Sequence, residues 1–363
     1  MSITKEQVLE ALKNVDDPDL KKDIVTLGMV KDVVVNEKNV SFTVVLTTPA
    51  CPMKEMIHKA CTNAIIHFVD KEAQVNVTMT ADVTSRRGDD RPVLPQVKNI
   101  VAIASGKGGV GKSTVASNLA VALALQGAKV GLVDADIYGP SMPIMFDVVN
   151  ERPGLKKVGE QSLLIPVESY GVKLLSIGFF TDTSQAIVWR GPMASKALNQ
   201  LFRDADWGEL DYLLIDLPPG TGDIHLSLVQ LAPLTGVIVV STPQAVALAD
   251  AQKGVAMFQM PQFNVPILGI VENMAYFTPA ELPDNKYYIF GKDGAKNLAE
   301  KLQVPLLGEI PLVQSICEAG DVGRPAVLQE GTPQSKAFKE LASSVAQQIA
   351  IKNAEKEIQQ VVA

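Results

Sequence analysis

The sequence predicts an α/β protein with a mostly parallel, doubly wound sheet, preceded by a small α+β domain. From Asn99 onward, apolar runs typical of buried strands alternate with helical stretches, and their Val, Ile and Leu content fits strands covered on both faces. Before that point, a unit of roughly 80 residues has its own helix and strand pattern, near the lower end of domain sizes. We therefore expect a small domain over 1–83, a linker over 84–98 and a larger domain over 99–363.

The first unit begins with a helical pattern that includes Val8 and Leu12. Two alternating strands follow and flank the sequence NEKN at 36–39, which is a plausible hairpin turn. A helix is expected over 53–69 and a last strand over 73–80. Together these elements predict a compact α+β unit.

Cys51 lies between the second strand and this helix. The free N–H groups at a helix start can lower the pKa of a nearby thiol and make it reactive. A lone cysteine is otherwise more often a small buried hydrophobe, so both interpretations stay open.

The boundary between the two domains is expected within TSRRGDDRPVLPQVK, residues 84–98. This segment is charged and contains two prolines and a glycine, a composition typical of an interdomain linker. An ordered surface loop is the alternative.

The larger domain is organised around a glycine-rich turn between its first strand and its first helix. The spacing Gly106-x4-Gly111-Lys112-Ser113 matches the phosphate-loop motif, and it follows an apolar run at 100–104. Glycines let the backbone wrap around phosphate oxygens, and the helix start adds the positive end of its dipole. Lys112 is expected to neutralise the β- and γ-phosphates, and the Ser113 hydroxyl to bind Mg²⁺. The predicted nucleotide-binding residues are Gly106, Gly108, Gly109, Val110, Gly111, Lys112, Ser113, Thr114 and Asn273.

Aspartates end two later strands of the same pattern. VDAD places Asp134 and Asp136 at a strand end, two residues apart and on the same side. DYLLID ends in Asp216, before a Pro-Gly loop whose glycines would let it reorder with the γ-phosphate. The carboxylates of Asp134 and Asp136 would repel a nearby phosphate unless they serve Mg²⁺ or a water. The alternative interpretation of VDAD is an Asp-rich turn. We expect a metal site from Ser113, Asp134 and Asp216.

Net charge, the length of apolar runs and the number of cysteines exclude several classes of function. A net charge of -7 and a pI of about 5.2 argue against a general nucleic-acid surface. No apolar run reaches the length of a membrane span, and the start MSITKEQ lacks the pattern of a signal peptide. Cys51, Cys61 and Cys317 are too few and too scattered for a disulfide framework. We expect a cytoplasmic protein that binds neither nucleic acid nor membrane.

The loop KGGVGKST resembles the deviant Walker A motif of the MinD/ParA/ArsA group. The resemblance implies a homodimer in which Lys107 reaches the nucleotide of the partner, as an arginine finger does elsewhere. An exposed lysine that only raises the local potential is the alternative. By the same resemblance, Asp136 positions the attacking water, Asp134 supports the water shell of the metal, and Asn273 contacts the base. The implied catalytic residues are therefore Lys107, Lys112 and Asp136.

Further motifs extend the resemblance over essentially the whole chain. DPDL, DIVTLGMV and LTTPACP resemble the small iron–sulfur assembly domain that is often fused to Mrp proteins, which implies a cluster or client thiol at Cys51. WRGPM at 189–193, DIYGPSMP and DLPPGTGD resemble Mrp/ApbC-type ATPases. The resemblance implies an ATP-binding and ATP-hydrolysing iron–sulfur cluster assembly or carrier factor. Its cofactors would be ATP and Mg²⁺, and its partners iron–sulfur apoproteins or assembly proteins.

The chain departs from the Mrp pattern at one place. Many Mrp-type carriers have a CxxC after the ENM segment, so that two subunits bridge one cluster with four thiolates. Here Pro279 and Leu282 occupy about those positions, and the chain contains no CxxC. Whether the protein holds an iron–sulfur cluster is therefore open.

Two alternative functions remain. A nucleotide-gated scaffold for client proteins would use the same ATPase residues without carrying a cluster. A spatial-organisation ATPase of the MinD/ParA sort would be expected to end in a basic amphipathic membrane helix. The C-terminal stripe of Phe338, Leu341, Val345 and Ile349 indicates more simply a helix docked on the sheet.

Overall fold

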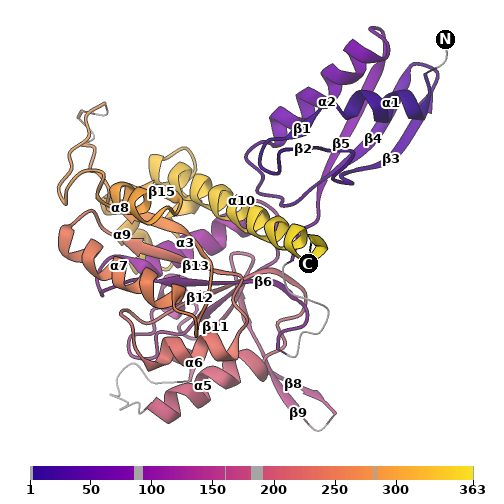
Figure 1. Cartoon of the computed structure of the whole chain (residues 1–363). Helices are drawn as coiled ribbons and strands as arrows, with labels where there is room; N and C mark the ends of the chain where they lie inside the picture. The colour runs from indigo at the N-terminus through magenta and orange to yellow at the C-terminus, as the bar shows by residue number, and fades with distance from the viewer. Residues whose placement is uncertain are drawn as a thin grey trace. The chain divides into compact units, whose positions relative to one another are not determined.

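The chain forms two compact units in the computed structural model, and each is considered by itself (Figure 1). The smaller unit comprises residues 1–86 together with 346–363, and the larger comprises 87–345. Grouping the C-terminal segment with the smaller unit is a feature that the sequence pattern does not indicate. The structure describes residues 3–85, 93–159, 161–180, 191–279, 281–282 and 284–362.

Residues 1–86 of the smaller unit form a three-stranded sheet, a short two-stranded sheet and two helices. These elements are α1 (Lys5–Leu12), β1 (Asp16–Asp17), β2 (Lys22–Asp23), β3 (Val30–Asn36), β4 (Asn39–Leu46), α2 (Lys54–Phe68) and β5 (Gln74–Ala81). The predicted hairpin joins β3 and β4, which are antiparallel, while β5 runs parallel to β4 because α2 crosses between them. Alternate β4 residues, Phe42 and Val44 among them, share a core with Ile57 of α2 and Leu12 of α1. The predicted α+β pattern of this unit is present.

The larger unit contains an eight-stranded sheet in the order β10-β11-β7-β12-β6-β13-β14-β15. Only β10 is antiparallel to its neighbour, so the predicted mostly parallel sheet is confirmed. The strands are β6 (Val97–Ala104), β7 (Val130–Asp134), β8 (Gly154–Val158), β9 (Gln161–Ile165), β10 (Val167–Ser169), β11 (Val172–Ser176), β12 (Leu210–Asp216), β13 (Gly236–Ser241), β14 (Ile267–Asn273) and β15 (Leu306–Ile310).

Helices cover both faces of this sheet (Figure 1). The helices after β6 are α3 (Lys112–Leu125), α4 (Met142–Met145), η1 (Ile177–Phe179), α5 (Gly191–Arg203), α6 (Asp223–Leu231), α7 (Ala245–Gln259), α8 (Gly294–Leu302), α9 (Gln314–Asp321), η2 (Ala326–Leu328) and α10 (Pro333–Val362), of which α10 continues into the smaller unit from residue 346. Ile100 of β6 shares a core with Phe202 of α5 and Phe258 of α7. Val101, the next residue, faces the opposite side, where α3 contacts the sheet. The sheet is therefore doubly wound, as predicted.

The sequence patterns do not predict strands β10 and β11 of the main sheet, nor the separate hairpin of β8 and β9. β11 pairs in parallel with β7 and lies within the main sheet, and β10 pairs with β11 at its edge. β8 and β9 form a separate antiparallel hairpin with exposed residues on both strands. Short, mixed strands of this kind lack the continuous apolar run that marked the other six strands.

Helix α10 buries the predicted C-terminal stripe, since Phe338, Leu341, Val345 and Ile349 are each at most 1% exposed. Within the larger unit, the side-chain amide of Gln126, which directly follows α3, donates to the carbonyl of Lys339 on α10 at 3.1 Å. Among the residues that the structure describes, no helix is long and apolar enough to cross a membrane.

Candidate functional site

The predicted phosphate-loop residues lie beyond the carboxyl ends of β6, β7 and β12, three neighbouring strands of the sheet. This is the edge at which open α/β sheets bind ligands. A pocket of about 210 Å³ opens there. It is lined by Ser105, Lys107, Gly108, Gly109, Val110, Gly111, Lys112, Ser113, Thr114, Asp136 and Pro219. The structure thus brings together most of the predicted nucleotide-binding residues with Lys107 and Asp136.

The loop backbone has the form that a phosphate group requires. Gly109 and Gly111 have φ angles of +81° and +79°, in the left-handed region that favours glycine. α3 begins directly after the loop at Lys112, so its free N–H groups and dipole face the pocket. The Ser105 hydroxyl also lies at this pocket, buried and without a hydrogen-bond partner among the described residues. A phosphate chain fits this set of donors.

Asn273 at the end of β14 is hydrogen-bonded to the phosphate loop. Its side-chain amide donates to the carbonyl of Val110 at 2.8 Å, and the residue is only 5% exposed. A Cβ atom on Gly111 would lie 2.2 Å from the same amide nitrogen. Glycine at 111 is therefore required both by its φ angle and by the approach of Asn273. The predicted contact of Asn273 with a base stays a prediction.

Glycine is required at position 106 because the backbone of helix α7 lies close to it. A Cβ atom there would lie 2.2 Å from the backbone carbon of Asp250 and 2.4 Å from the nitrogen of Ala251. Helix α7 thus packs directly against the backbone of the phosphate loop, which fixes the start of the loop relative to the sheet.

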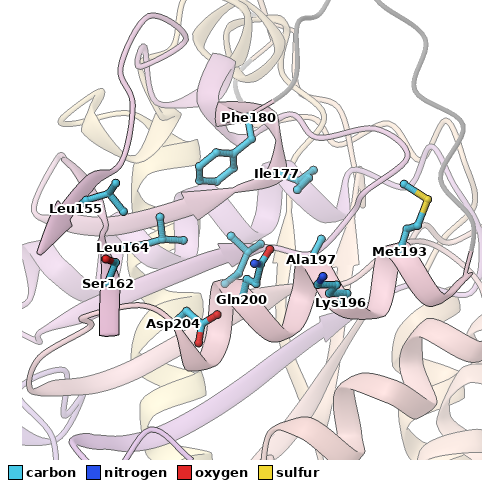
Figure 2. Close-up of a pocket in the computed structure, with 11 residues that line it drawn as sticks. Leu155, Ser162, Leu164, Ile177, Phe180, Met193, Lys196, Ala197, Gln200 and Asp204 are labelled. Carbon is cyan, nitrogen blue, oxygen red and sulfur yellow. The ribbon is translucent and has the colours of Figure 1, made fainter. Parts of the chain in front are cut away.

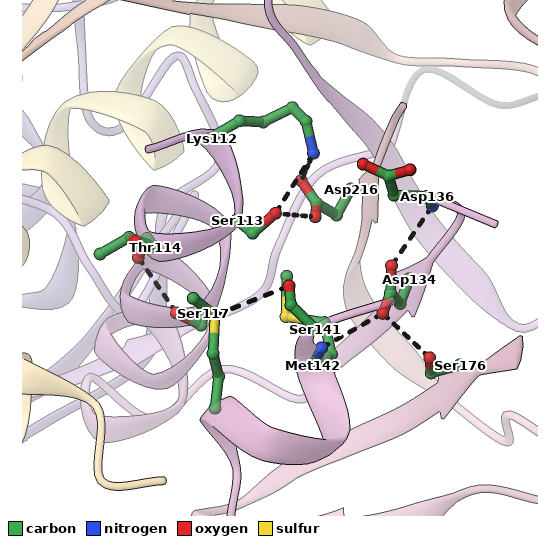
Figure 3. Close-up of polar contacts among 11 residues, drawn as sticks. Lys112, Ser113, Thr114, Ser117, Asp134, Asp136, Ser141, Met142, Ser176 and Asp216 are labelled. Atoms are coloured by element: carbon green, nitrogen blue, oxygen red, sulfur yellow. Dashed lines mark hydrogen bonds and ion pairs between the residues drawn. The ribbon is translucent and has the colours of Figure 1, made fainter. Parts of the chain in front are cut away.

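Lys112, Ser113 and Asp216 form the central polar cluster (Figure 3). The Lys112 ammonium donates to Asp216 Oδ1 at 2.7 Å and to the Ser113 hydroxyl at 3.3 Å. The Ser113 hydroxyl donates to Asp216 Oδ2 at 2.7 Å. Burial raises the pKa of Asp216, while the Lys112 charge acts to lower it. Serine and carboxylate oxygens side by side are a donor set suited to Mg²⁺.

Asp134 is fully buried beside this cluster and fixes the neighbouring loops (Figure 3). Its carboxylate accepts from the Ser176 hydroxyl at 2.9 Å, the Met142 amide at 3.2 Å and the Asp136 amide at 3.3 Å. Burial, and then the charge of Asp216, raise the pKa of Asp134. Asp136 itself lines the pocket. The roles of Asp134 at a metal and of Asp136 at a water stay predictions.

Backbone hydrogen bonds join the loop after β12 to the end of β6 and to the start of the phosphate loop. The Leu217 amide donates to the Ile103 carbonyl at 3.0 Å, and the Gly220 amide donates to the Ser105 carbonyl at 2.9 Å. At the far end, the Gly222 amide donates to Nδ1 of His225 at 3.2 Å. Sequence reasoning missed His225, although its place three residues after the helix-capping Gly222 is the usual position of a capping side chain.

The three thiols have different surroundings. Cys51 is half-buried, and burial raises the pKa of its thiol more than the Met53 and Lys54 amides at the helix start lower it. Cys51 also packs against the core of the smaller unit. Of the two interpretations, these surroundings favour a thiol that packs as a small hydrophobe over one activated by the helix start. Burial raises the pKa of Cys61 to about 12, whereas Cys317 is exposed.

A second pocket, of about 640 Å³, lies between the β8–β9 hairpin, η1 and α5 (Figure 2). Its lining is mostly apolar and includes Leu155, Leu164, Ile177, Phe180, Met193 and Ala197. Met193 ends the predicted WRGPM motif, whose Trp189 and Arg190 lie outside the described residues.

A phosphate loop before a helix, with a buried carboxylate against its lysine and serine, defines a nucleotide-binding protein of the P-loop NTPase class. The family model of the NUBPL iron-transfer P-loop NTPase matches residues 96–346, and that of an iron–sulfur cluster assembly protein matches residues 5–81. The chain therefore belongs to the NUBPL-type family of iron-transfer P-loop NTPases, and the predicted resemblance is confirmed.

Relatives resemble the chain over nearly its whole length. An iron–sulfur cluster carrier protein of Synechocystis is 47% identical over 349 residues, covering 96% of this chain and 97% of the relative. The carrier protein of Escherichia coli K12 is 41% identical over 344 residues, covering 94% and 91%. A nucleotide-binding protein of Archaeoglobus fulgidus, solved in complex with ADP, has a TM-score of 0.56 and 39% identity, covering 66% of this chain and 91% of that one.

Proposed function

We propose that the protein binds and hydrolyses ATP with Mg²⁺ and uses this cycle, in the cytoplasm, to assemble or carry iron–sulfur clusters. The observation that carries the hydrolase part is the contact of Lys112 and Ser113 with Asp216 beside the phosphate-loop pocket. Lys112 would neutralise phosphate charge, Ser113 and Asp216 would hold the metal, and Asp136 would orient the attacking water. The Archaeoglobus relative was solved in complex with ADP, which supports the proposal that this chain binds a nucleotide.

Replacing Lys112 by alanine tests the hydrolase. The change removes the one ammonium that contacts Asp216 in the cluster, so ATP turnover is expected to fall to background. The measurement is phosphate release at saturating ATP. Lys129→Ala is the matched control, because Lys129 is exposed and pairs only with the exposed Glu209 among the described residues. Undiminished turnover in Lys112→Ala would overturn the assignment.

The cluster part of the proposal rests on the family and on the small domain. The Synechocystis and Escherichia coli relatives are named iron–sulfur cluster carrier proteins, and the N-terminal family match is an iron–sulfur cluster assembly protein. The described residues contain no group of three or more His, Cys, Asp or Glu arranged to hold a metal ion. A cluster carried as cargo would therefore use thiols of more than one chain, and Cys51 is the proposed contributor.

Anaerobic reconstitution with iron and sulfide tests this role of Cys51. Bound iron and visible absorbance are measured for the intact chain and for Cys51→Ala, with Cys61→Ala as the control because Cys61 is buried. We expect a cluster in the intact chain and in the control, and its loss in Cys51→Ala. A cluster that persists without Cys51 would contradict the assignment.

A second candidate function is a nucleotide-gated scaffold that binds client proteins without holding metal. The missing CxxC favours it, since Pro279 and Leu282 cannot bind iron. Absence of a cluster in every variant, together with ATP-dependent capture of an iron–sulfur apoprotein, would select this function.

A further inference from the structure

His225 is a buried imidazole that neither the sequence motifs nor the proposed chemistry uses. It lies in the first turn of α6 and is 1% exposed. The chain has three histidines, and the other two, His58 and His67, lie on α2 of the smaller unit. A buried polar ring directly after the Asp216 loop needs a physical reason, because burying it without partners costs free energy.

One ring nitrogen of His225 takes part in a hydrogen bond with the backbone. Nδ1 accepts the hydrogen bond from the Gly222 amide, so the neutral ring carries its proton on Nε2. Burial lowers the pKa of His225, as does the nearby charge of Lys112, whereas the Gly222 and Pro218 backbone groups raise it. Nε2 makes no hydrogen bond of normal geometry to a described residue, although the Pro218 carbonyl is near enough to act on the ring. The ring edge packs against Phe258 of α7, with centroids 6.2 Å apart.

The loop that His225 holds lies at the phosphate pocket. The Gly220 amide is bonded to the Ser105 carbonyl, and Pro219 lines the pocket next to Gly108. The loop is therefore fixed at its start by strand pairing, in its middle by Ser105 and at its end by His225. Removing the last attachment would let the middle of the loop move relative to the phosphates.

We propose that His225 is a positioning residue for nucleotide hydrolysis, whose neutral imidazole accepts the Gly222 amide and so holds residues 217–222 over the phosphate pocket. This proposal rests on the ATPase function proposed above. His225 does not touch the phosphates; it acts through the loop, and its loss is expected to slow turnover more than it weakens nucleotide binding.

Two substitutions separate positioning from packing. His225→Leu removes the acceptor, and kcat for ATP is expected to fall about 10- to 100-fold with KM changed less than about threefold. His225→Gln keeps an acceptor at the position where glutamine commonly bonds the helix-capping amide, and we expect it to restore kcat to within about threefold of the unsubstituted chain. Phe258→Leu is the matched control, because it loosens the packing on the ring but keeps the Nδ1 bond. It should lower the thermal midpoint without lowering kcat.

A spectroscopic readout does not depend on turnover. Two-bond ¹H–¹⁵N correlation spectra of the full chain should show a neutral Nε2–H tautomer for His225 at pH 7.5. Adding Mg·ADP should shift the His225 signals and leave those of His58 and His67 unchanged. A charged or Nδ1–H ring at His225 would overturn the proposal.

The outcomes distinguish the two proposals. If the unsubstituted chain binds ADP but releases no phosphate from ATP, the ATPase function fails, whereas the tautomer and the ADP-dependent shift still test the loop contact. If the unsubstituted chain hydrolyses ATP and folded His225→Leu does so equally well, the positioning role is wrong and the ATPase function stands. If His225→Leu does not fold, equal loss of kcat in His225→Gln and Phe258→Leu would show a packing role and overturn the proposal.

Discussion

At the scale of single residues, the glycines of the phosphate loop meet different requirements although the motif treats them alike. Gly109 has a left-handed φ but open space where a Cβ atom would lie. Gly111 has nearly the same φ and also faces the amide of Asn273. The motif spacing predicts both glycines. It does not predict the contact with Asn273, because a partner 163 residues from Val110 is set by the order of the strands.

This difference predicts different costs for two similar substitutions. Gly109→Ala should cost only backbone strain, about 1–2 kcal/mol. Gly111→Ala adds the displacement of Asn273 and the loss of its bond to Val110, about 1 kcal/mol more. We expect ADP binding to weaken about fivefold more in Gly111→Ala than in Gly109→Ala. Titration calorimetry with Mg·ADP measures this, and equal affinities would show that Asn273 does not constrain the loop.

At the scale of elements, β14 and α8 are joined by a buried carboxylate. Glu272 on β14 is 1% exposed and accepts a hydrogen bond from the Ala295 amide in the first turn of α8. Burial raises the pKa of Glu272, and the charges of Glu309 and Asp293 raise it further. The folded pKa therefore lies above the unfolded value of 4.5, so the folded state favours the protonated acid. Its contribution to stability is full below pH 4.5 and is lost as pH rises through the folded pKa.

Glu272→Gln should therefore become more favourable as pH rises. Glutamine keeps an oxygen for the Ala295 amide but carries no charge at any pH. The difference in unfolding free energy between variant and parent should shift toward the variant from pH 4.5 to 7.5, by about 1.4 kcal/mol for each unit of pKa elevation. Urea unfolding at the two pH values measures it. Glu300→Gln, at an exposed position of α8, should show no such trend; a trend of the same size there would contradict the assignment to Glu272.

Prediction of elements from sequence succeeded where burial was continuous. The strands β6, β7, β12, β13 and β14 are buried on both faces, so their residue content reveals them. The half-buried β15 at the sheet edge is revealed by its apolar residues Leu306, Leu307 and Ile310. β11 is also buried, but Lys173 interrupts its pattern, and the lysine is accommodated because its ammonium donates to the Trp207 carbonyl at 2.8 Å. A hydrogen bond to a distant backbone group leaves no signal in the local sequence.

At the scale of the whole molecule, the homodimer that the resemblance implies predicts a role for Lys107 that can be tested. Lys107 lines its own phosphate pocket, and the resemblance to the MinD/ParA/ArsA group implies that it completes the pocket of a second copy. Lys107→Ala and Lys112→Ala should each lack turnover. A mixed dimer would combine the intact pocket of the first variant with the intact Lys107 of the second.

Mixing the two inactive variants should therefore restore activity. Random pairing of equal amounts gives half mixed dimers with one working site each, so about a quarter of the parent activity is expected. Phosphate release after incubation of the mixture measures it, with each variant alone at the same total concentration as the control. No recovery between two folded, nucleotide-binding variants would contradict the role in trans.

The eight-stranded sheet ends at one edge in β10, which has three residues and runs against its neighbour. A long, straight edge strand offers a row of unpaired amides and carbonyls to any passing chain, and this is a common start of aggregation. Here the edge strand has only three residues, so the row of unpaired groups is short and growth of the sheet by strand addition at this edge is disfavoured. We therefore expect this edge of the sheet to contribute little to aggregation of the chain.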